Sequence, residues 1–269
     1  MHRGSVEAMS THEHEAQGLG QERHRGPLRE GERVQIRDPK GRLHTVILVS
    51  GGRFQSNRGF IDHDDLIGRP DGQVVTTEEG RQFQILRPLQ VDYVMSMPRG
   101  AAVVYPKDAG TIVHYADIFP GAVVVEAGAG SGALSMALLD AVGERGRLIS
   151  VERREEFAQI ARDNVDLWFG APHPAWDLRV NDLADELNAM PESSVDRVVL
   201  DMLAPWDNLD AVAHALVPGG VLCCYIATVT QMSRLIEDLR SSQNFTDPVA
   251  WETLSREWHV DGLAVRPEH

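Results

Sequence analysis

The pattern of hydrophobic and polar positions divides the chain into three stretches. Residues 1–26 hold few apolar side chains among many polar and charged ones, so they cannot bury enough surface to offset the entropy of ordering, and we predict a disordered tail. From Gly31 onward, short alternating segments are interrupted by turn residues such as those at 39–41. This alternation predicts a small N-terminal antiparallel β domain over residues 27–90.

The third stretch, residues 111–269, alternates apolar strands with amphipathic helical segments, which is typical of βαβ units around a parallel sheet. Residues 91–110 are predicted to form a linker that contributes to the functional site. Strands are predicted at 123–126, 147–152, 177–181, 195–201 and 221–228, helices at 133–142, 154–169, 206–216 and 230–242, and a final strand at 258–265. The predicted fold class is therefore α/β.

Composition narrows the classes of function. The net charge is −14, and the acidic excess falls in residues 111–269, so a polyanionic partner would meet mainly the first domain and local arginines. The chain has no run of about 18 apolar residues and no apolar signal-peptide core, so we expect a cytoplasmic protein without a membrane segment. The adjacent Cys223 and Cys224 are expected to be buried strand residues. The histidines show no ligand spacing, so no metal site is expected.

A glycine-rich turn follows the first strand of the α/β stretch, in VVVEAGAGSG at 123–132. Gly128 and Gly130 permit a sharp turn and the close approach of a ligand, and the next helix offers free N–H groups to a polar or anionic group. The letters GAGSGA also satisfy G-x-G-x-x-G/A, so the turn alone fits a dinucleotide equally well. Glu152 ends the second strand, where a carboxylate accepts hydrogen bonds from ribose hydroxyls, a feature shared by NAD and S-adenosylmethionine sites.

Three further acids separate these cofactors. Glu126 stands two residues before Gly128, where it would repel a pyrophosphate and attract a cationic methionine group. Asp182 ends the third strand, where it can accept from an adenine amino group, and Asp201 ends the fourth, in DMLAPW. With Glu152, four acids therefore fall at the strand ends where open α/β sheets bind ligands. Taken singly, Glu126 or Asp182 could instead cap the following helix.

Four segments carry a resemblance to a known family: MPRGAAVVYPKDAGTIV, EAGAGSGALS, LDMLAPW and IATVTQ. Over about residues 30–265 the chain resembles the tRNA (adenine-58-N1)-methyltransferases of bacteria and archaea, especially actinobacterial members, which are class I methyltransferases. The resemblance implies a Rossmann-like methyltransferase sheet behind a small N-terminal β domain. It also implies S-adenosylmethionine as cofactor, tRNA as substrate, and a homotetramer.

The resemblance assigns roles residue by residue. Asp201 would be the catalytic carboxylate, with Tyr105 at the reaction centre and Tyr225 helping to hold the flipped base. Glu152 would bind the ribose of the cofactor and Asp182 its adenine. The implied cofactor-binding residues are Glu126, Gly128, Gly130, Ser131, Gly132, Ala133, Leu134, Glu152, Arg153, Asp182, Leu183 and Asp201.

Each aromatic candidate also has a purely structural interpretation. Tyr105 could pack between domains, Tyr225 could belong to the core, and Trp206 is expected to pack beneath the site. Candidate phosphate contacts are Arg58, Arg87, Arg99 and Lys107, although any one of them could be a solvated surface charge.

Other functions remain as alternatives. The same fold could methylate protein isoaspartate or DNA adenine, but the YPKD segment and the N-terminal β domain disfavour this. A non-catalytic tRNA-binding subunit is disfavoured by the four intact acids, and an oxidoreductase ranks last because no acid–base residue for hydride chemistry accompanies the turn. Relatives continue beyond RPEH at 266–269 into a further antiparallel strand. We therefore expect the final strand of the sheet to be missing, segment 258–265 to lack its neighbour, and stability or assembly to be impaired.

Overall fold

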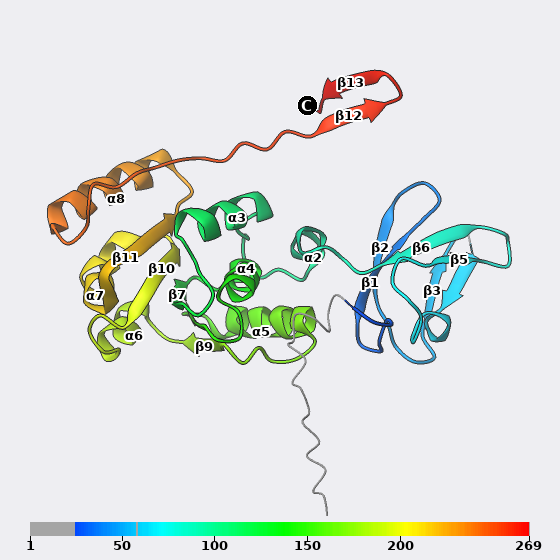
Figure 1. The fold of residues 1–269 in the computed structure, drawn as a ribbon, viewed down its shortest axis with the longest axis horizontal. Helices are drawn as coiled ribbons and strands as arrows, with labels where there is room; N and C mark the ends of the chain where they lie inside the picture. The colour runs from blue at the N-terminus through cyan, green and yellow to red at the C-terminus, as the bar shows by residue number, and fades with distance from the viewer. Residues whose placement is uncertain (1–24, 58, 269) are drawn as a thin grey trace, which may run out of the picture.

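The structure is a computed structural model that describes residues 25–57 and 59–268, arranged as a small β unit and a larger α/β unit (Figure 1). Apart from its last two residues, the predicted tail lies outside the described residues. Within the described ranges, no helix is both long and apolar enough to cross a membrane.

The N-terminal unit is a four-stranded antiparallel sheet with strand order β2-β1-β6-β5, accompanied by the β3–β4 hairpin. Alternate positions such as Val34, Ile36, Phe83 and Ile85 point into one apolar core, which is the alternation that predicted the unit. Its elements are β1 (Arg33–Arg37), β2 (Leu43–Ile47), β3 (Arg53–Ser56), β4 (Gly59–Asp62), the short helix η1 (His63–Asp65), β5 (Val74–Thr76) and β6 (Gln82–Leu86).

The larger unit is a five-stranded parallel sheet with order β11-β10-β7-β8-β9, which confirms the Rossmann-like prediction. Its strands are β7 (Val123–Ala127), β8 (Arg147–Glu152), β9 (Trp176–Val180), β10 (Val195–Asp201) and β11 (Leu216–Tyr225). Its helices are α2 (Gln90–Ser96), α3 (Pro106–Tyr115), α4 (Ala133–Val142), α5 (Glu155–Phe169), α6 (Leu183–Ala189), η2 (Pro205–Asn208), α7 (Leu209–Ala215) and α8 (Val229–Ser242). The strand order reverses at β7, and a ligand site is expected at that point.

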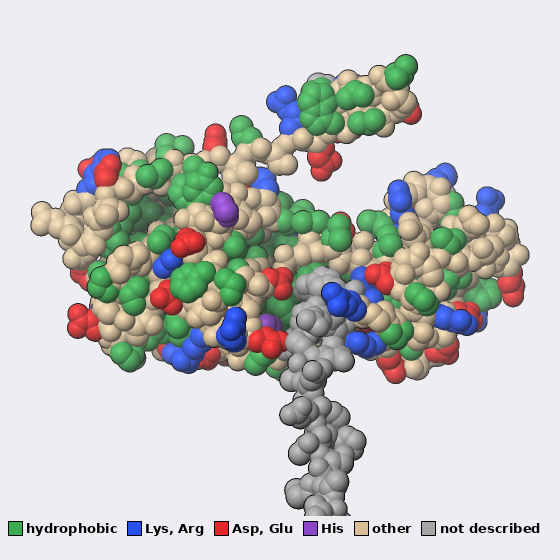
Figure 2. Space-filling view, viewed as in Figure 1, with side chains coloured by type: hydrophobic (Ala, Val, Ile, Leu, Met, Phe, Trp, Pro, Cys, Tyr) green, Lys and Arg blue, Asp and Glu red, His purple; other side chains and the backbone are tan. Residues whose placement is uncertain are grey.

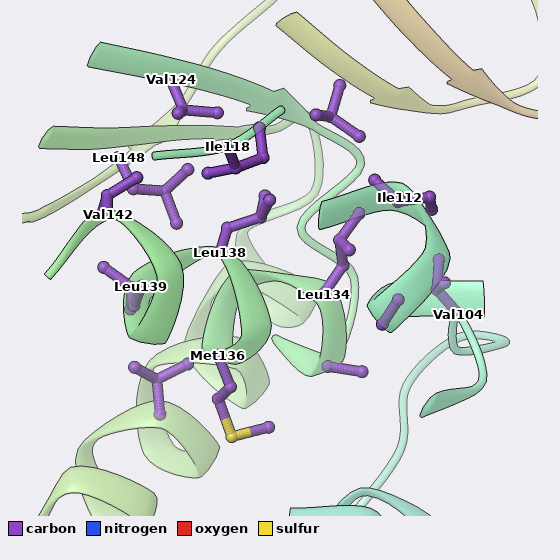
Figure 3. Close-up of a cluster of buried hydrophobic side chains, with 14 of the residues drawn as sticks. Val104, Ile112, Ile118, Val124, Leu134, Met136, Leu138, Leu139, Val142 and Leu148 are labelled. Carbon is purple, nitrogen blue, oxygen red and sulfur yellow. The ribbon is translucent and has the colours of Figure 1, made fainter. Parts of the chain in front are cut away.

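Helices cover both faces of this sheet. Neighbouring residues of a strand point to opposite faces, so Val124 packs with α3, α4 and α5 while Val125 packs with α6 and α7. Figure 3 shows Leu138 of α4 beneath the strands that carry Val124 and Leu148, and Leu134 near Ile112 of α3. The sheet is therefore held between two apolar layers. Its edge strand β11 contains the free thiols of Cys223, which is buried, and Cys224, which is half-buried.

Helix α2, which lies in the predicted linker, packs into the larger unit. The Tyr93 hydroxyl donates a hydrogen bond to the Asn164 carbonyl oxygen at 2.7 Å, and its ring lies 4.9 Å from that of Trp168. Arg33 of β1 reaches the same helix, since its guanidinium donates to the Ser96 carbonyl oxygen at 2.6 Å and covers the Tyr93 ring. These contacts join the β unit to the core of the α/β unit.

The single final strand predicted at 258–265 is wrong. The structure instead contains two strands, β12 (Trp258–Asp261) and β13 (Ala264–Pro267), which pair only with each other in antiparallel register. The cause is the Gly262-Leu263 pair, which forms a two-residue hairpin loop between the paired residues Asp261 and Ala264. Gly262, at the first loop position, has a φ of +57°. This hairpin stands apart from both sheets (Figure 1).

Candidate active site

The glycine turn after β7 is fixed by close contacts as well as by its backbone angles. Gly128, Gly130 and Gly132 all have positive φ values, a region that other residues rarely adopt. A Cβ atom at Gly128 would lie 1.9 Å from the backbone oxygen of Asp201, and one at Gly132 would lie 2.9 Å from Val165. The turn therefore sits directly against the end of β10 and the side of α5.

Asn164 locks this turn to the segment before α3. Its side-chain amide, buried on α5, donates to the carbonyl oxygens of Ser131 and Pro98, both at 2.9 Å. The Ser131 hydroxyl in turn accepts from the Gly100 N–H at 3.2 Å. Sequence analysis missed Asn164; the available signal was a polar residue on the otherwise apolar face of the predicted helix 154–169.

Glu126 is fully buried beneath the turn. Its Oε2 accepts hydrogen bonds from the hydroxyls of Ser135 and Ser150, both at 2.6 Å, whereas its Oε1 is buried without a hydrogen-bond partner. Burial raises the pKa of Glu126 to about 7, against the opposing effect of the two hydroxyls. By its charge, a buried carboxylate beneath the turn favours a cationic group there and disfavours a pyrophosphate.

The other two expected cofactor acids differ in their surroundings. Glu152 is buried, and its oxygens accept from the backbone N–H groups of Gly130 and Arg154, both at 3.1 Å. Asp182 caps α6 by accepting from the Ala184 N–H at 3.0 Å, and its other oxygen lies 3.7 Å from Nε of Arg153. The capping alternative for Asp182 is thus realised, although its side chain remains half-exposed at the same sheet edge.

The apolar members of the predicted set belong to the core. Ala133 and Leu134 are buried in the layer under α4, and Leu183 is buried in the layer on the opposite face. These three residues can therefore offer a cofactor their backbone but little of their side chains.

Asp201 and Tyr225 lie side by side at the ends of β10 and β11, where they are register partners. Burial raises the pKa of Asp201 to about 6, and the negative charge of Glu152 adds to the shift. The Tyr225 hydroxyl donates to Oδ2 of Asp108 at 3.1 Å. Burial and this bond raise the pKa of Tyr225 to about 12, with smaller contributions from Asp201 and from Tyr105.

Tyr105 precedes α3 and is half-exposed, so it is not a buried packing residue. Its carbonyl oxygen accepts from the Asp108 N–H at 2.8 Å, so Tyr105 adjoins the residue that holds the Tyr225 hydroxyl. Asp108 was missed as a site residue, although it stands in the YPKD segment that carried the resemblance.

Two of the diagnostic segments meet behind Asp201. Thr228 caps α8 by accepting from the Gln231 N–H at 3.2 Å, and the Gln231 side chain donates to the Leu203 carbonyl oxygen at 3.1 Å. This bond holds the loop of DMLAPW against IATVTQ. Trp206 packs against the Arg234 guanidinium, 4.1 Å from the ring centre, consistent with its predicted structural role.

The predicted phosphate contacts are mostly engaged within the protein. The Arg87 side chain is buried and pairs with Glu32, so the prediction is wrong for this residue. Arg99 donates to the Met95 carbonyl oxygen at 2.7 Å, and Lys107 pairs with Asp108. Arg58 lies outside the described residues. In the described part of the chain, no cluster of three or more His, Cys, Asp or Glu side chains is suited to a metal ion.

Comparison with known proteins places this geometry in context. Residues 26–75 match the family model described as TrmI-like N-terminal, and residues 83–266 match that of the tRNA methyltransferase complex GCD14 subunit. The chain is 34% identical over 225 residues to tRNA (adenine(58)-N(1))-methyltransferase TrmI of Thermus thermophilus, covering 84% of this chain and 86% of the relative. It is 30% identical to the tRNA (adenine(57)-N(1)/adenine(58)-N(1))-methyltransferase TrmI of Methanocaldococcus jannaschii, covering 80% and 82%.

Two solved structures are similar over nearly the whole chain. A SAM-dependent O-methyltransferase from Thermotoga maritima has a TM-score of 0.79 and 28% identity, covering 90% of this chain and 89% of that one. The tRNA (m1A58) methyltransferase TrmI from Aquifex aeolicus has a TM-score of 0.76 and 25% identity, covering 90% and 92%.

Gly128→Ala is expected to abolish cofactor binding, because the new Cβ would overlap the Asp201 carbonyl and force the turn away from β10. The matched control is Gly170→Ala, which also has a positive φ, in the left-handed region, but open space around its Cβ. It should lose only the ~1–2 kcal/mol of backbone strain. Isothermal titration with S-adenosylmethionine and thermal melting of both variants test this. Equal binding by the two would contradict it.

The affinity for S-adenosylmethionine should fall as the pH drops below about 7, the folded-state pKa of Glu126. A cationic ligand needs the ionised carboxylate, and below this pH a proton must first be removed from it. Glu126→Gln should bind more weakly at pH 8, and the advantage of the unaltered protein over it should shrink towards pH 6. Taking the ratio of the two affinities cancels the ligand's own titration. A ratio independent of pH would refute the role of Glu126.

Proposed function

The chain belongs to the family of the tRNA methyltransferase complex GCD14 subunit, and we propose that it methylates N1 of adenine 58 in the T-loop of tRNA, using S-adenosylmethionine, in the cytoplasm. The observation that carries the proposal is the half-buried carboxylate of Asp201, which adjoins both the glycine turn and Tyr225. The names of the relatives from T. thermophilus and M. jannaschii support the choice of base and atom.

The residues around the turn fit the cofactor in two respects. Glu126 would place a negative charge beneath the turn, close to the ammonium group, and Glu152 adjoins the turn with a carboxylate for the ribose hydroxyls. Asp182 and Arg153 border the position proposed for the adenine. When bound, S-adenosylmethionine supplies an electrophilic methyl group on a sulfonium centre. The turn, which contacts the end of β10 at Asp201, would hold the cofactor there.

Asp201 stabilises the charge that forms on the substrate. Adenine N1 gains a bond to carbon as the sulfur–carbon bond breaks, so positive charge spreads over the ring and its N6 amino group. A carboxylate that accepts a hydrogen bond from N6 lowers the energy of this charge, and it can afterwards take up the amino proton. Its partial burial strengthens the interaction, because little water competes for the carboxylate.

Tyr105 and Tyr225 are proposed to hold the adenine once it has left the tRNA fold. N1 of a base stacked inside the T-loop cannot reach the methyl group, so the base must be extruded into the pocket. The half-exposed ring of Tyr105 offers a stacking surface that offsets part of this cost. The hydroxyl of Tyr225 is engaged by Asp108, which fixes this ring beside Asp201.

We also propose that the chain works as a homotetramer assembled in part through the β12–β13 hairpin. Trp258 and Val260 of β12 share one face with their partners Pro267 and Val265 of β13, and every member of this face is apolar. Trp258, Val260 and Val265 are exposed, and Figure 2 shows apolar side chains gathered on the surface of the hairpin. A lone two-stranded hairpin is only marginally stable in water, so this face needs a partner.

Asp201→Asn should lower the rate of methyl transfer by ~10²–10⁴-fold, the contribution of a positioned acid or base. In the unaltered protein, kcat/KM should fall as the pH drops below about 6, because the carboxylate becomes protonated there. The assay uses unmodified tRNA and follows 1-methyladenosine by nucleoside analysis, with tRNAs altered at position 57 or 58 to assign the site. Formation of a different methylated product would overturn the proposed acceptor.

Val260→Asp should dissociate the tetramer into smaller species. Burying an unpaired carboxylate in an apolar interface between subunits costs free energy. The control is Val74→Asp, a similarly exposed valine on β5 of the N-terminal unit. Native mass spectrometry of the full chain should show a tetramer for the unaltered protein and for the control. If the tetramer persists in Val260→Asp, the hairpin face does not form part of the interface between subunits.

A further inference from the structure

The first turn of α3 carries a buried carboxylate that the proposed mechanism does not use directly. Asp108 is buried, and Nζ of Lys107 bonds its Oδ1 at 2.7 Å and its Oδ2 at 2.9 Å. The hydroxyl of Tyr225 donates to the same Oδ2 at 3.1 Å. The carboxylate is thus charge-paired on one side and holds the phenol on the other.

This phenol is in turn placed against the reaction centre. Tyr225 is the register partner of Asp201 on the neighbouring parallel strand, and both residues end their strands at the edge where the glycine turn lies. The ring of Tyr225 is half-buried and packs against the apolar layer that contains α3 and α4, so its hydroxyl is the polar end that needs a partner. Within the described chain, the tip of Tyr225 is held by Asp108.

The support of Asp108 extends to a distant part of the sequence. Lys107 directs its third N–H to the Thr253 carbonyl oxygen at 2.9 Å, so all three ammonium donors are used. The hydroxyls of Thr111 and Thr253 lie 3.2 Å apart, and Trp251 stacks on Tyr115 with ring centres 4.8 Å apart. The segment after α8 therefore runs along α3 and fixes its first turn, before the chain continues into β12 (Figure 1).

We propose that Asp108 is a positioning residue for methyl transfer, which acts by holding the Tyr225 phenol in place beside Asp201. This inference rests on the proposed function, because the base that Tyr225 faces is the adenine to be methylated. The high pKa of Tyr225, about 12, agrees with the assignment, since the phenol stays protonated and donates throughout the working range of pH. Asp108 touches neither the cofactor acids nor the glycine turn in any contact described above, so its effect should pass through Tyr225.

A double-mutant cycle tests this route. Asp108→Ala removes both acceptor oxygens that hold the phenol, and Tyr225→Phe removes the hydroxyl. Each should lower kcat by about 10- to 100-fold, as expected for a misplaced reacting group, with KM for S-adenosylmethionine changed by less than about twofold. The double variant should be no slower than the slower single variant, because both changes break the same contact. Independent, multiplying losses would overturn the proposal.

Asp117→Asn is the matched control. Asp117 follows the end of α3, its side chain is exposed and pairs with Arg197 at 2.9 Å, and its left-handed backbone suits asparagine. The control should keep the kcat of the unaltered protein. An equal loss of kcat in this control would show that removing any acid near α3 is damaging, and would overturn the assignment to Asp108.

A second readout is independent of the tRNA substrate. In protein labelled with fluorotyrosine, the ¹⁹F resonance of Tyr225 is identified by its loss in Tyr225→Phe. Asp108→Ala should move this resonance and leave that of Tyr93, which is buried in the core, in place. Movement of both would indicate a general structural role and overturn the proposal. Absence of 1-methyladenosine from the unaltered protein would instead overturn the proposed function, and the Tyr225 resonance would then decide the Asp108 contact alone.

Discussion

The site depends on the close approach of two backbone segments, the glycine turn after β7 and the end of β10. The space between Gly128 and the Asp201 carbonyl is too small for any side-chain carbon, so the two strand ends meet without an intervening group. Because β7 and β10 are neighbours in the parallel sheet, this contact joins the turn proposed to bind the cofactor to the acid proposed to face the substrate. A methyl transfer needs both reactants at contact distance, and the missing Cβ makes that distance possible.

The same closeness gathers negative charge. Glu126, Glu152 and Asp201 lie near enough to one another that Glu152 raises the pKa of Asp201, and both raise that of Glu126. A raised pKa means that ionisation of Glu126 and Asp201 disfavours the folded state as the pH rises through these values. A sulfonium and an ammonium group on one ligand would relieve this repulsion. The negative charge of these carboxylates is therefore not fully compensated within the site, and a cationic cofactor would compensate it.

The parts of the fold that could be predicted from the sequence are those encoded by the spacing of apolar residues and by the glycine-rich turn. The strand and helix pattern predicted the parallel sheet, and strand ends followed by acids predicted the edge at which Glu126, Glu152 and Asp201 gather. Prediction from the sequence failed where a contact depends on residues far apart in sequence. The link from Asn164 to Ser131 and that from Asp108 to Tyr225 join segments whose approach is set by packing, which no local pattern encodes. The hairpin at Gly262 is a different failure, since a glycine at the first position of its two-residue loop was a turn signal in the sequence, yet the segment was predicted as one strand.

The first turn of α3 links a local sequence segment to contacts that are distant in the sequence. Lys107 and Asp108 are adjacent in the YPKD segment, yet they contact two different parts of the later chain. Lys107 bonds the Thr253 carbonyl oxygen, and Asp108 accepts from the Tyr225 hydroxyl. The helix therefore acts as a spacer between the segment that leads to the exposed hairpin and the strand that ends at the reaction centre. A partner that buries the hairpin would also order the segment at Thr253, and so would reduce the freedom of α3 at its first turn. The proposed assembly and the proposed catalysis would then share one set of contacts, which runs from Thr253 through Lys107 and Asp108 to Tyr225.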